Sequence, residues 1–354
     1  MMMRCIENLR SDLDEITSRS ENEIEHLLSH GVLVTGGSGF VGRWLISSLA
    51  AVAERNGLPS RLVSINRKTP AWQQSLVGEG MLKVINHDIT SGIPDLGEFG
   101  YVFHCATPAS ADLNNSQPAE MERVIAEGTE SVIRRFGGTK CRVVNVSSGA
   151  VYGVQPPNVQ CLDEEWLQDD RHVLPDSAYH RGKSGAESRF NSASEGSSFS
   201  VVHTRLFAFL APFLPLDTHF AAGNFVRDAL MNRPIAINGD TRTVRTYMYG
   251  TDLVVWLIAA ALRGVSGCAY NVGSPHETTI GELAEIVAQR AGSESGVSHG
   301  ALQDLSTPPH RYVPCTTRSE RELGVSLQVS LIEAIDRTLL WHRSEPQQNS
   351  AASA

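Results

Sequence analysis

Residues 32–42 read VLVTGGSGFVG and determine how the chain begins its fold. A short apolar run leads into Gly36, Gly39 and Gly42, and an apolar stretch with helical spacing follows as far as Gly57. This order predicts a strand, a tight turn and a helix. Glycines at this spacing let the backbone approach a pyrophosphate, and the N-terminus of the following helix favours negative charge. The stretch therefore predicts the first unit of a dinucleotide-binding fold.

Short apolar runs and helical stretches alternate through the first 205 residues. Strands that are buried on both faces of a parallel sheet read as continuous apolar runs, so this alternation predicts a parallel sheet covered by helices. The expected fold class is α/β: a Rossmann-type doubly wound parallel sheet with a smaller mixed α/β C-terminal substrate lobe. After the first strand, the further strands are expected within residues 61–67, 81–90, 101–107, 141–148 and 200–205.

The same patterns divide the chain into parts. Residues 1–30 carry apolar side chains at helical spacing among many charges, which predicts an N-terminal helical extension outside the main fold. The polar, small residues 343–354 are expected to be a disordered tail. Between them we expect a dinucleotide-binding Rossmann domain and a substrate-binding lobe. The Rossmann domain is assigned to residues 31–205, with 251–273 returning to it, and the lobe to 206–250 and 274–342.

Composition and charge exclude several classes of protein. The chain has 354 residues, of which 41% are hydrophobic and 19% are charged, as in ordinary globular proteins. Its formal net charge of -9 does not favour nucleic-acid binding, which needs clustered Lys and Arg. No stretch approaches the roughly 18 apolar residues of a membrane span, and the N-terminus is charged where a signal peptide would be apolar. The six cysteines are scattered without metal-ligand spacing, so we expect reduced thiols, no metal and a cytoplasmic location.

The expected second strand ends in SINRK, where a dinucleotide fold contacts the adenosine ribose. An acidic residue at this place would bind a free 2′-hydroxyl, but the sequence has Asn66, followed by Arg67 and Lys68. Arginine nearby suits a 2′-phosphate, which favours NADP over NAD. The alternative is that Arg67 and Lys68 are surface charges without a ligand.

Serine, tyrosine and lysine side chains are expected to meet at the carboxyl edge of the sheet, where open α/β folds bind ligands. Ser147 and Ser148 end the fifth strand, and Tyr179 and Lys183 lie one turn apart on the next expected helix. A lysine beside a phenol can stabilise the phenolate by opposite charge. An isolated pair of this spacing could also be a solvated helix face.

The stretches TGGSGFVG, SSGAVYG and YHRGK together resemble the extended short-chain dehydrogenase/reductase superfamily, in its NAD(P)-dependent nucleotide-sugar epimerase/dehydratase branch. The resemblance covers roughly residues 31–342. It implies that HDI contacts the adenine and that FHCAT lines the cofactor cleft. The cofactor residues so implied are Gly36, Gly39, Phe40, Val41, Asn66, Arg67, Asp88, Ile89, Cys105, Ala106, Thr107, Tyr179 and Lys183.

The resemblance also implies a catalytic set. Tyr179 would act as the general acid/base on a sugar hydroxyl. A free tyrosine has a pKa near 10, so it needs a neighbouring group to ionise near neutral pH. Lys183 would favour the phenolate and hydrogen-bond the nicotinamide ribose. Ser148 would hydrogen-bond the reacting oxygen, with Ser147 as the alternative serine. Hydride would leave C4 of the sugar and give a 4-keto product.

The substrate implied by the resemblance is a nucleotide-diphosphate sugar, contacted by Thr107 and Ser148. Arg245, Arg311 and Asn224 match residues that bind the diphosphate, and arginine suits phosphate oxygens bidentately. Relatives commonly form homodimers through a helix bundle, so a homodimer is expected.

The sequence departs from the familiar pattern at several positions. In dehydratases an Asp-Glu pair follows the active-site serine or threonine, and decarboxylases usually carry a glutamate there, whereas this chain has Gly149 and Ala150. Ala208 and Ile125 replace asparagines found in many relatives. Gly149 and Ala150 disfavour dehydratase and decarboxylase chemistry, and Ala208 and Ile125 mean that the identity of the sugar cannot be transferred from familiar relatives. The expected activity is that of an NDP-sugar 4-epimerase. The alternatives are an NADPH-dependent 4-keto-sugar reductase and a 4,6-dehydratase with displaced acid and base; the intact catalytic set disfavours a non-catalytic cofactor-binding protein.

Overall fold

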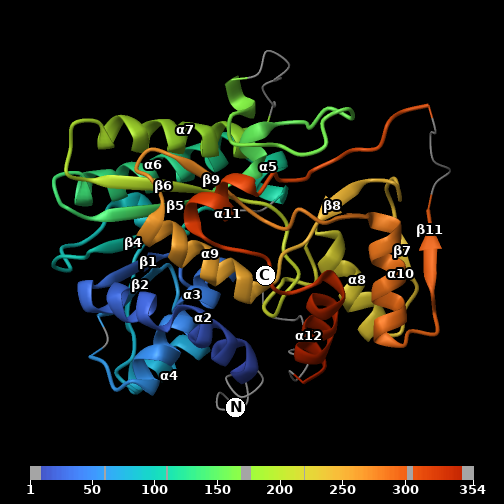
Figure 1. Ribbon diagram of the computed structural model, residues 1–354, viewed down its shortest axis with the longest axis horizontal. Helices are drawn as coiled ribbons and strands as arrows, with labels where there is room; N and C mark the ends of the chain where they lie inside the picture. Colours follow the sequence, from blue (N-terminus) through green and yellow to red (C-terminus); the bar gives the residue numbers. More distant parts are fainter. Residues whose placement is uncertain are drawn as a thin grey trace.

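The computed structural model describes residues 9–59, 61–108, 111–168, 177–218, 220–300 and 306–344. Seven parallel strands form its central sheet in the order β3-β2-β1-β4-β5-β6-β9 (Figure 1). The expected doubly wound sheet is therefore confirmed. The strands are β1 (Val32–Thr35), β2 (Leu62–Asn66), β3 (Lys83–Asn86), β4 (Tyr101–His104), β5 (Arg142–Ser148), β6 (Ser200–Leu206) and β9 (Ala269–Val272).

Helices cover both faces of this sheet because alternate residues of each strand point to opposite sides. In β1, Val32 and Val34 join the core that contains α3 and α9, whereas Leu33 joins the core on the side of α6 and α7. Figure 1 shows α6 and α7 above the sheet and α3 and α9 below it. These helices are α3 (Phe40–Arg55), α6 (Pro118–Phe136), α7 (Ala178–Ser194) and α9 (Gly250–Arg263).

The N-terminal helix α2 (Arg10–His30) packs into the main core. From its many charges we had expected it to lie outside the main fold. Ile16, Ile24 and Leu27 are fully buried, and the helix contacts α3 and α9. Arg19 of α2 forms an ion pair with the buried carboxylate of Asp252 at 2.7 Å, at the start of α9. The amphipathic pattern therefore marked the correct buried face, but its position against α9 needed the structure.

A second hydrophobic core lies in the C-terminal half and unites α8 (Ala221–Leu230), α10 (Ile280–Ala291) and α12 (Leu331–Ser344). Two small sheets accompany these helices. β8 (Val244–Thr246) pairs antiparallel with β10 (Glu277–Thr279), and β7 (Ile235–Ile237) pairs parallel with β11 (Val297–His299). Since α12 continues to Ser344, it passes the expected start of a disordered tail, and residues 345–354 lie outside the described residues.

The remaining elements are short and connect these layers: α4 (Ala71–Gly78), α5 (Ala111–Ser116), α11 (Thr317–Leu323) and the single turns η1 (Ile89–Ser91), η2 (Gly149–Tyr152) and η3 (Trp166–Gln168). None of the helices in the described part of the chain is long and apolar enough to cross a membrane.

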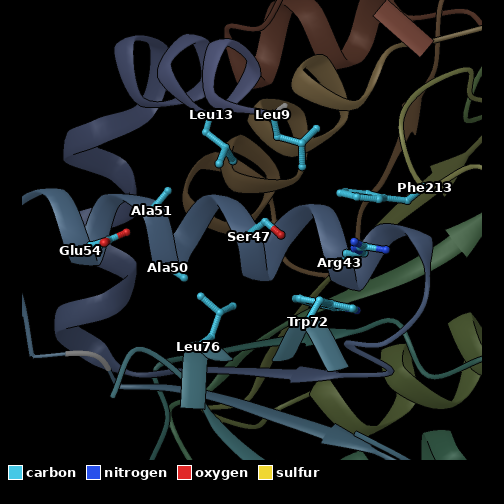
Figure 2. A pocket seen from close by; sticks show the side chains of 10 residues that line it. All are labelled: Leu9, Leu13, Arg43, Ser47, Ala50, Ala51, Glu54, Trp72, Leu76 and Phe213. Carbon is cyan, nitrogen blue, oxygen red and sulfur yellow. The ribbon is translucent and has the colours of Figure 1, made fainter. Parts of the chain in front are cut away.

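Arg43, in the first turn of α3, lies between two aromatic rings (Figure 2). Its guanidinium carbon is 3.7 Å from the centre of the Phe213 ring and 5.1 Å from that of Trp72. Leu9 and Leu13 of α2 line the same pocket. The cavity volume is about 30 Å³, far below what a nucleotide needs, so this pocket is a packing gap that adjoins the start of α3.

Candidate active site

The turn between β1 and α3 has the shape that a bound pyrophosphate requires. Gly36 has a positive φ of 68°, and a Cβ at this position would lie 2.7 Å from Ala106 Cα in the loop after β4. Only glycine fits such a close approach. Gly39 caps α3 without a side-chain hydrogen bond, which leaves the first N–H groups of the helix for a ligand. The turn therefore fits a dinucleotide, with Phe40 and Val41 in the first turn of the helix.

The side chain of Asn66, at the end of β2, is committed to protein contacts. Its Oδ1 accepts hydrogen bonds from the Ser38 backbone N–H at 2.9 Å and the Ser64 hydroxyl at 3.1 Å, and its Nδ2 donates to Gln73. Asn66 therefore holds the glycine-rich turn, which differs from the free ribose contact expected from the sequence. Arg67, the next residue, is exposed.

Asp88 and the loop after β4 border the same edge of the sheet. Asp88 accepts hydrogen bonds from the backbone N–H and the hydroxyl of Thr90, and these bonds hold the pKa of its carboxyl below the usual value. It caps η1, where Ile89 is buried. Cys105 is half-buried, and burial raises the pKa of its thiol to about 12, so it stays uncharged.

Helix α7 starts with local caps that place Tyr179 in its first turn. Ser177 Oγ accepts a hydrogen bond from the His180 N–H at 3.2 Å, as an N-cap serine does. The Tyr179 N–H donates to Asn114 Oδ1 of α5 at 2.9 Å. The His180 ring nitrogen Nδ1 donates to the Ala150 carbonyl at 2.8 Å. Asn114 thus holds the Tyr179 turn against α5, and His180 holds it against η2. No local sequence pattern predicts either contact.

Lys183 is buried one turn after Tyr179, so the pair is not a solvated helix face. Its ammonium donates to Thr107 Oγ1 at 2.6 Å and to the Val146 carbonyl at 2.7 Å, and it lies 5.7 Å from the centre of the Tyr179 ring. Burial lowers the pKa of Lys183 to about 8, against the opposing effect of Cys105 and Glu187.

Ser147 and Ser148, at the end of β5, have different surroundings. Burial raises the pKa of Tyr179 above its usual value, and a side-chain hydrogen bond with Ser148 opposes the rise. The Lys183 ammonium lies near the same ring but donates its hydrogen bonds to Thr107 and Val146. Ser147 instead donates to the buried carboxylate of Glu187 at 2.5 Å. Ser148 Oγ accepts a hydrogen bond from the Ala150 N–H at 3.1 Å, so the two serines have different partners.

Residues 32–273 match the model of the NAD dependent epimerase/dehydratase family. The chain belongs to this family. The match spans the whole central sheet from β1 to β9, including the turn at Gly36 and the group formed by Ser148, Tyr179 and Lys183. The match leaves out α2 and the part of the chain after residue 273, so the described fold is longer than the segment that matches the family.

Known proteins similar to this family member modify nucleotide sugars. UDP-glucuronic acid decarboxylase 1 of Xenopus tropicalis is 26% identical over 315 residues, which cover 89% of this chain and 72% of that protein. UDP-glucuronic acid decarboxylase 1 of Arabidopsis thaliana is 26% identical over 309 residues, covering 86% and 68%.

Two solved structures share the fold. UDP-glucose 4-epimerase of Thermotoga maritima, with UDP-glucose, has a TM-score of 0.74 and 20% identity, and covers 88% of this chain and 98% of its own. dTDP-glucose 4,6-dehydratase of Streptomyces venezuelae, with NAD bound, has a TM-score of 0.75 and 24% identity, with 88% and 96% covered.

Arg245, on β8, is a half-buried guanidinium without a carboxylate partner among the described residues. Its Nη1 donates to the Val244 carbonyl at 2.8 Å, and burial lowers its pKa from the usual value. Arg311 differs, because it forms an ion pair with Glu277 and lines an open pocket of about 590 Å³. Asn224 Oδ1 accepts from Arg227 within α8 at 3.1 Å. Arg245 is therefore the best prepared of the three for an anion.

Tyr312 is a site residue that the sequence reasoning missed. Its hydroxyl lies 2.5 Å from the position that a Cβ on Gly149 would take, and its ring centre is 4.5 Å from that of Phe207. It stands two residues before Pro314 in PPHRYVP, a stretch without helical or strand periodicity, so nothing local placed it beside Gly149. In this stretch the expected site residue was Arg311, as a ligand of the diphosphate, and not Tyr312.

The histidine of β4 behaves as a core residue. His104 is buried, contacts Thr35 Oγ1 at 2.9 Å, and has its pKa lowered by burial to about 3. Among the described residues, no three His, Cys, Asp or Glu side chains come together as metal ligands would.

Proposed function

We propose that this protein oxidises C4 of the hexose in a nucleotide-diphosphate sugar and then reduces the 4-keto product on its other face, as an NDP-sugar 4-epimerase. The proposal refines the family membership, which covers epimerases and dehydratases alike. Tyr179, Ser148 and Lys183 are the proposed catalytic residues.

The chemistry assigned to these residues is acid/base catalysis. Tyr179, as phenolate, takes the proton of the C4 hydroxyl, while Ser148 hydrogen-bonds the same oxygen. The C–H and O–H bonds at C4 break and a carbonyl forms. The NAD(P) whose pyrophosphate the Gly36 turn would hold would supply the hydride acceptor. Lys183, which donates to Thr107, places its positive charge near the Tyr179 ring and so favours the phenolate.

The observation that carries this choice is the environment of Gly149. This residue follows Ser148, where dehydratases and decarboxylases of the resembled branch carry proton-transferring side chains. A Cβ at residue 149 would lie 2.5 Å from the Tyr312 hydroxyl and 2.8 Å from Phe207 Cζ. No side chain fits there, and the methyl of Ala150 cannot move a proton. Chemistry confined to C4 needs no further acid or base at this position.

The substrate's diphosphate is assigned to Arg245, with Arg311 and Asn224 as further contacts. A half-buried guanidinium without a carboxylate partner in the described segments gains more from an anion than a paired one does. We assign residues 206–250 and 274–342 as the substrate lobe and 31–205 with 251–273 as the cofactor domain. Location in the cytoplasm is proposed on the sequence alone.

A homodimer through α6 and α7 is also proposed, and its interface would be polar. On the outer faces of these helices, Arg181 pairs with Glu122 at 2.7 Å and Arg189 with Glu130 at 3.3 Å. Such ion pairs are exposed and salt-sensitive.

A second candidate is an NADPH-dependent 4-keto-sugar reductase. The exposed Arg67 and the absence of a carboxylate at residue 66 favour a cofactor with a 2′-phosphate. NADP is therefore the preferred cofactor in our proposal, and NAD is the alternative.

The test is to denature freshly purified protein, identify any nucleotide released, and then incubate the native protein with UDP-glucose and UDP-glucuronic acid separately. An epimerase releases stoichiometric NAD(P) and converts a sugar to its C4 epimer without net change in absorbance of reduced cofactor. Tyr179→Phe is the control and should abolish turnover while keeping the nucleotide. Protein that arrives empty and consumes NADPH with a 4-keto sugar favours the reductase. Carbon dioxide release from UDP-glucuronic acid would overturn the choice of C4-only chemistry.

A further inference from the structure

The position of the Ser148 hydroxyl depends on the residue two places further along the chain. Ser148 ends β5, and its Oγ accepts a hydrogen bond from the Ala150 N–H at 3.1 Å, so that the serine caps η2. A serine hydroxyl has one hydrogen to donate and two acceptor lone pairs. The bond from Ala150 uses one lone pair and leaves the hydrogen for another oxygen. Whatever holds Ala150 in place therefore also sets where the Ser148 Oγ lies.

The Ala150 carbonyl accepts two hydrogen bonds, one from within η2 and one from outside it. The Gly153 N–H donates to it at 3.1 Å and closes the turn. The His180 Nδ1 of α7 donates to it at 2.8 Å. A single turn of 3-10 helix has poorer hydrogen-bond geometry than an α-helix, so η2 gains from an external bond. The His180 ring supplies that bond and fastens η2 to α7.

The His180 ring has a defined orientation. Its side chain is buried, with 3% of the residue exposed. A carbonyl oxygen can only accept, so Nδ1 carries the hydrogen in the bond to Ala150. Nε2, on the other side of the ring, lies 3.5 Å from the hydroxyl of Ser184, one turn further along α7. Contacts on both sides thus hold the ring between α7 and η2.

We propose that His180 is a positioning residue of the active site, whose Nδ1–H holds Ala150 and, through it, the Ser148 hydroxyl at a fixed place relative to Tyr179. Tyr179 is the preceding residue, and its N–H donates to Asn114 at 2.9 Å. One turn of α7 therefore carries both the phenol and the group that places the serine. The role rests on the proposed function, in which Ser148 and Tyr179 meet the same sugar oxygen. Two groups that act on one atom need a fixed separation.

The experiment compares His180→Asn, His180→Gln and His180→Leu in the full-length protein. The asparagine amide nitrogen is bonded to Cγ, as Nδ1 is, whereas the glutamine nitrogen lies one bond further out. The first readout is hydrogen–deuterium exchange of peptides that cover residues 149–153, where the Ala150 and Gly153 N–H groups are bonded. We expect exchange there to be about tenfold faster in the leucine and glutamine variants, and close to wild type in the asparagine variant.

The second readout is turnover of UDP-glucose. We expect kcat to fall about tenfold in the leucine and glutamine variants with KM unchanged, because the serine bond matters during reaction, and we expect asparagine to restore kcat. His203→Leu is the matched control. His203 is also a buried histidine that bonds α7, but it contacts Asn191 near the far end of the helix at 2.9 Å. Its loss should leave the exchange of η2 unchanged.

Three results would overturn the proposal: wild-type exchange of η2 in every variant, asparagine exchanging as fast as leucine, or faster exchange with an unchanged kcat. If the leucine variant does not fold, the asparagine and glutamine variants still give the comparison. The exchange readout needs no substrate. A wild-type protein that turns over no nucleotide sugar would refute the proposed function, whereas the exchange of η2 would still decide whether His180 holds Ala150.

Discussion

The Lys183 ammonium joins two strands, since it donates to Thr107 Oγ1 in the loop after β4 at 2.6 Å and to the Val146 carbonyl of β5 at 2.7 Å. Both acceptors are neutral. The charge is thus buried with dipoles for partners, and this arrangement costs stability while it keeps the ammonium next to the Tyr179 ring. Burial of an ammonium with neutral partners therefore fits the catalytic role that we propose for Lys183.

Replacing Lys183 with methionine should therefore change how stability depends on pH. Burial lowers the pKa of Lys183 from 10.5 to about 8 in the folded protein. Between these values the unfolded chain binds more protons, so the free energy of unfolding of the wild type rises with pH. Relative to Lys183→Met, we expect a rise on the order of 3 kcal/mol between pH 8 and pH 10.5. Urea unfolding at a series of pH values measures it; parallel curves for the two proteins would contradict it.

Glu187→Gln should destabilise the protein strongly. Glu187 and Arg205 form a bidentate ion pair, both buried, and Ser147 also donates to the carboxylate. Removing the negative charge leaves a buried guanidinium uncompensated, which costs about 3–5 kcal/mol. Burial would raise the pKa of Glu187, but Arg205 outweighs burial and keeps this pKa below its usual value of 4.5. The stability that the ion pair contributes is therefore present at neutral pH. It is lost only as the pH falls through the folded pKa, below 4.5.

The matched control for this variant is Glu122→Gln. Glu122 also pairs with an arginine of α7, Arg181, but these side chains are 39% and 45% exposed, against 9% and 6% for Glu187 and Arg205. Such a pair contributes about 0–1 kcal/mol. Chemical denaturation of the two variants side by side compares them, and similar losses would show that burial does not set the cost of the Glu187 pair.

Arg67→Ala should separate the two cofactors. If the exposed Arg67 contacts a 2′-phosphate, its loss lowers the affinity for NADP+ about tenfold, or ~1.4 kcal/mol, and leaves that for NAD+ unchanged. Lys83→Ala, on the exposed edge strand β3, is the control for a general loss of positive charge. Calorimetric titration with each nucleotide gives both constants. Equal effects on NAD+ and NADP+ would remove the reason for preferring NADP.

The central sheet could be predicted from the sequence because its strands are apolar runs, such as residues 141–148, that are buried on both faces. The contacts of Tyr179 and Lys183 could be placed only roughly, because helical spacing fixes the turn but not the partners. Tyr312 could not be found. It reaches Gly149 through a segment of irregular backbone that pairs with β8, and such long-range placement leaves no periodic signal.

The side chain of Asn66 shows another limit. Its position at the end of β2 follows from the strand pattern, but its partners Ser38, Ser64 and Gln73 come from three different elements. An amide has both donors and an acceptor, so it can fill a place that a carboxylate could fill only in part. The sequence pattern does not show whether the Asn66 amide bonds a cofactor or the protein itself, because its partner Gln73 comes from α4, which packs beside the end of β2.

Helix α2 has a practical consequence for anyone who produces this protein. Truncation at residue 31, next to the start of the family segment, would strip Ile16, Ile24 and Leu27 from the faces of α3 and α9 that they cover. It would also leave Asp252 without the guanidinium of Arg19. The shortened chain would expose a continuous apolar surface on α3 and α9 and would leave the Asp252 carboxylate without its ion-pair partner. We expect this chain to aggregate during expression. We therefore expect that the smallest stable unit includes α2 and is longer than residues 32–273, which match the family model.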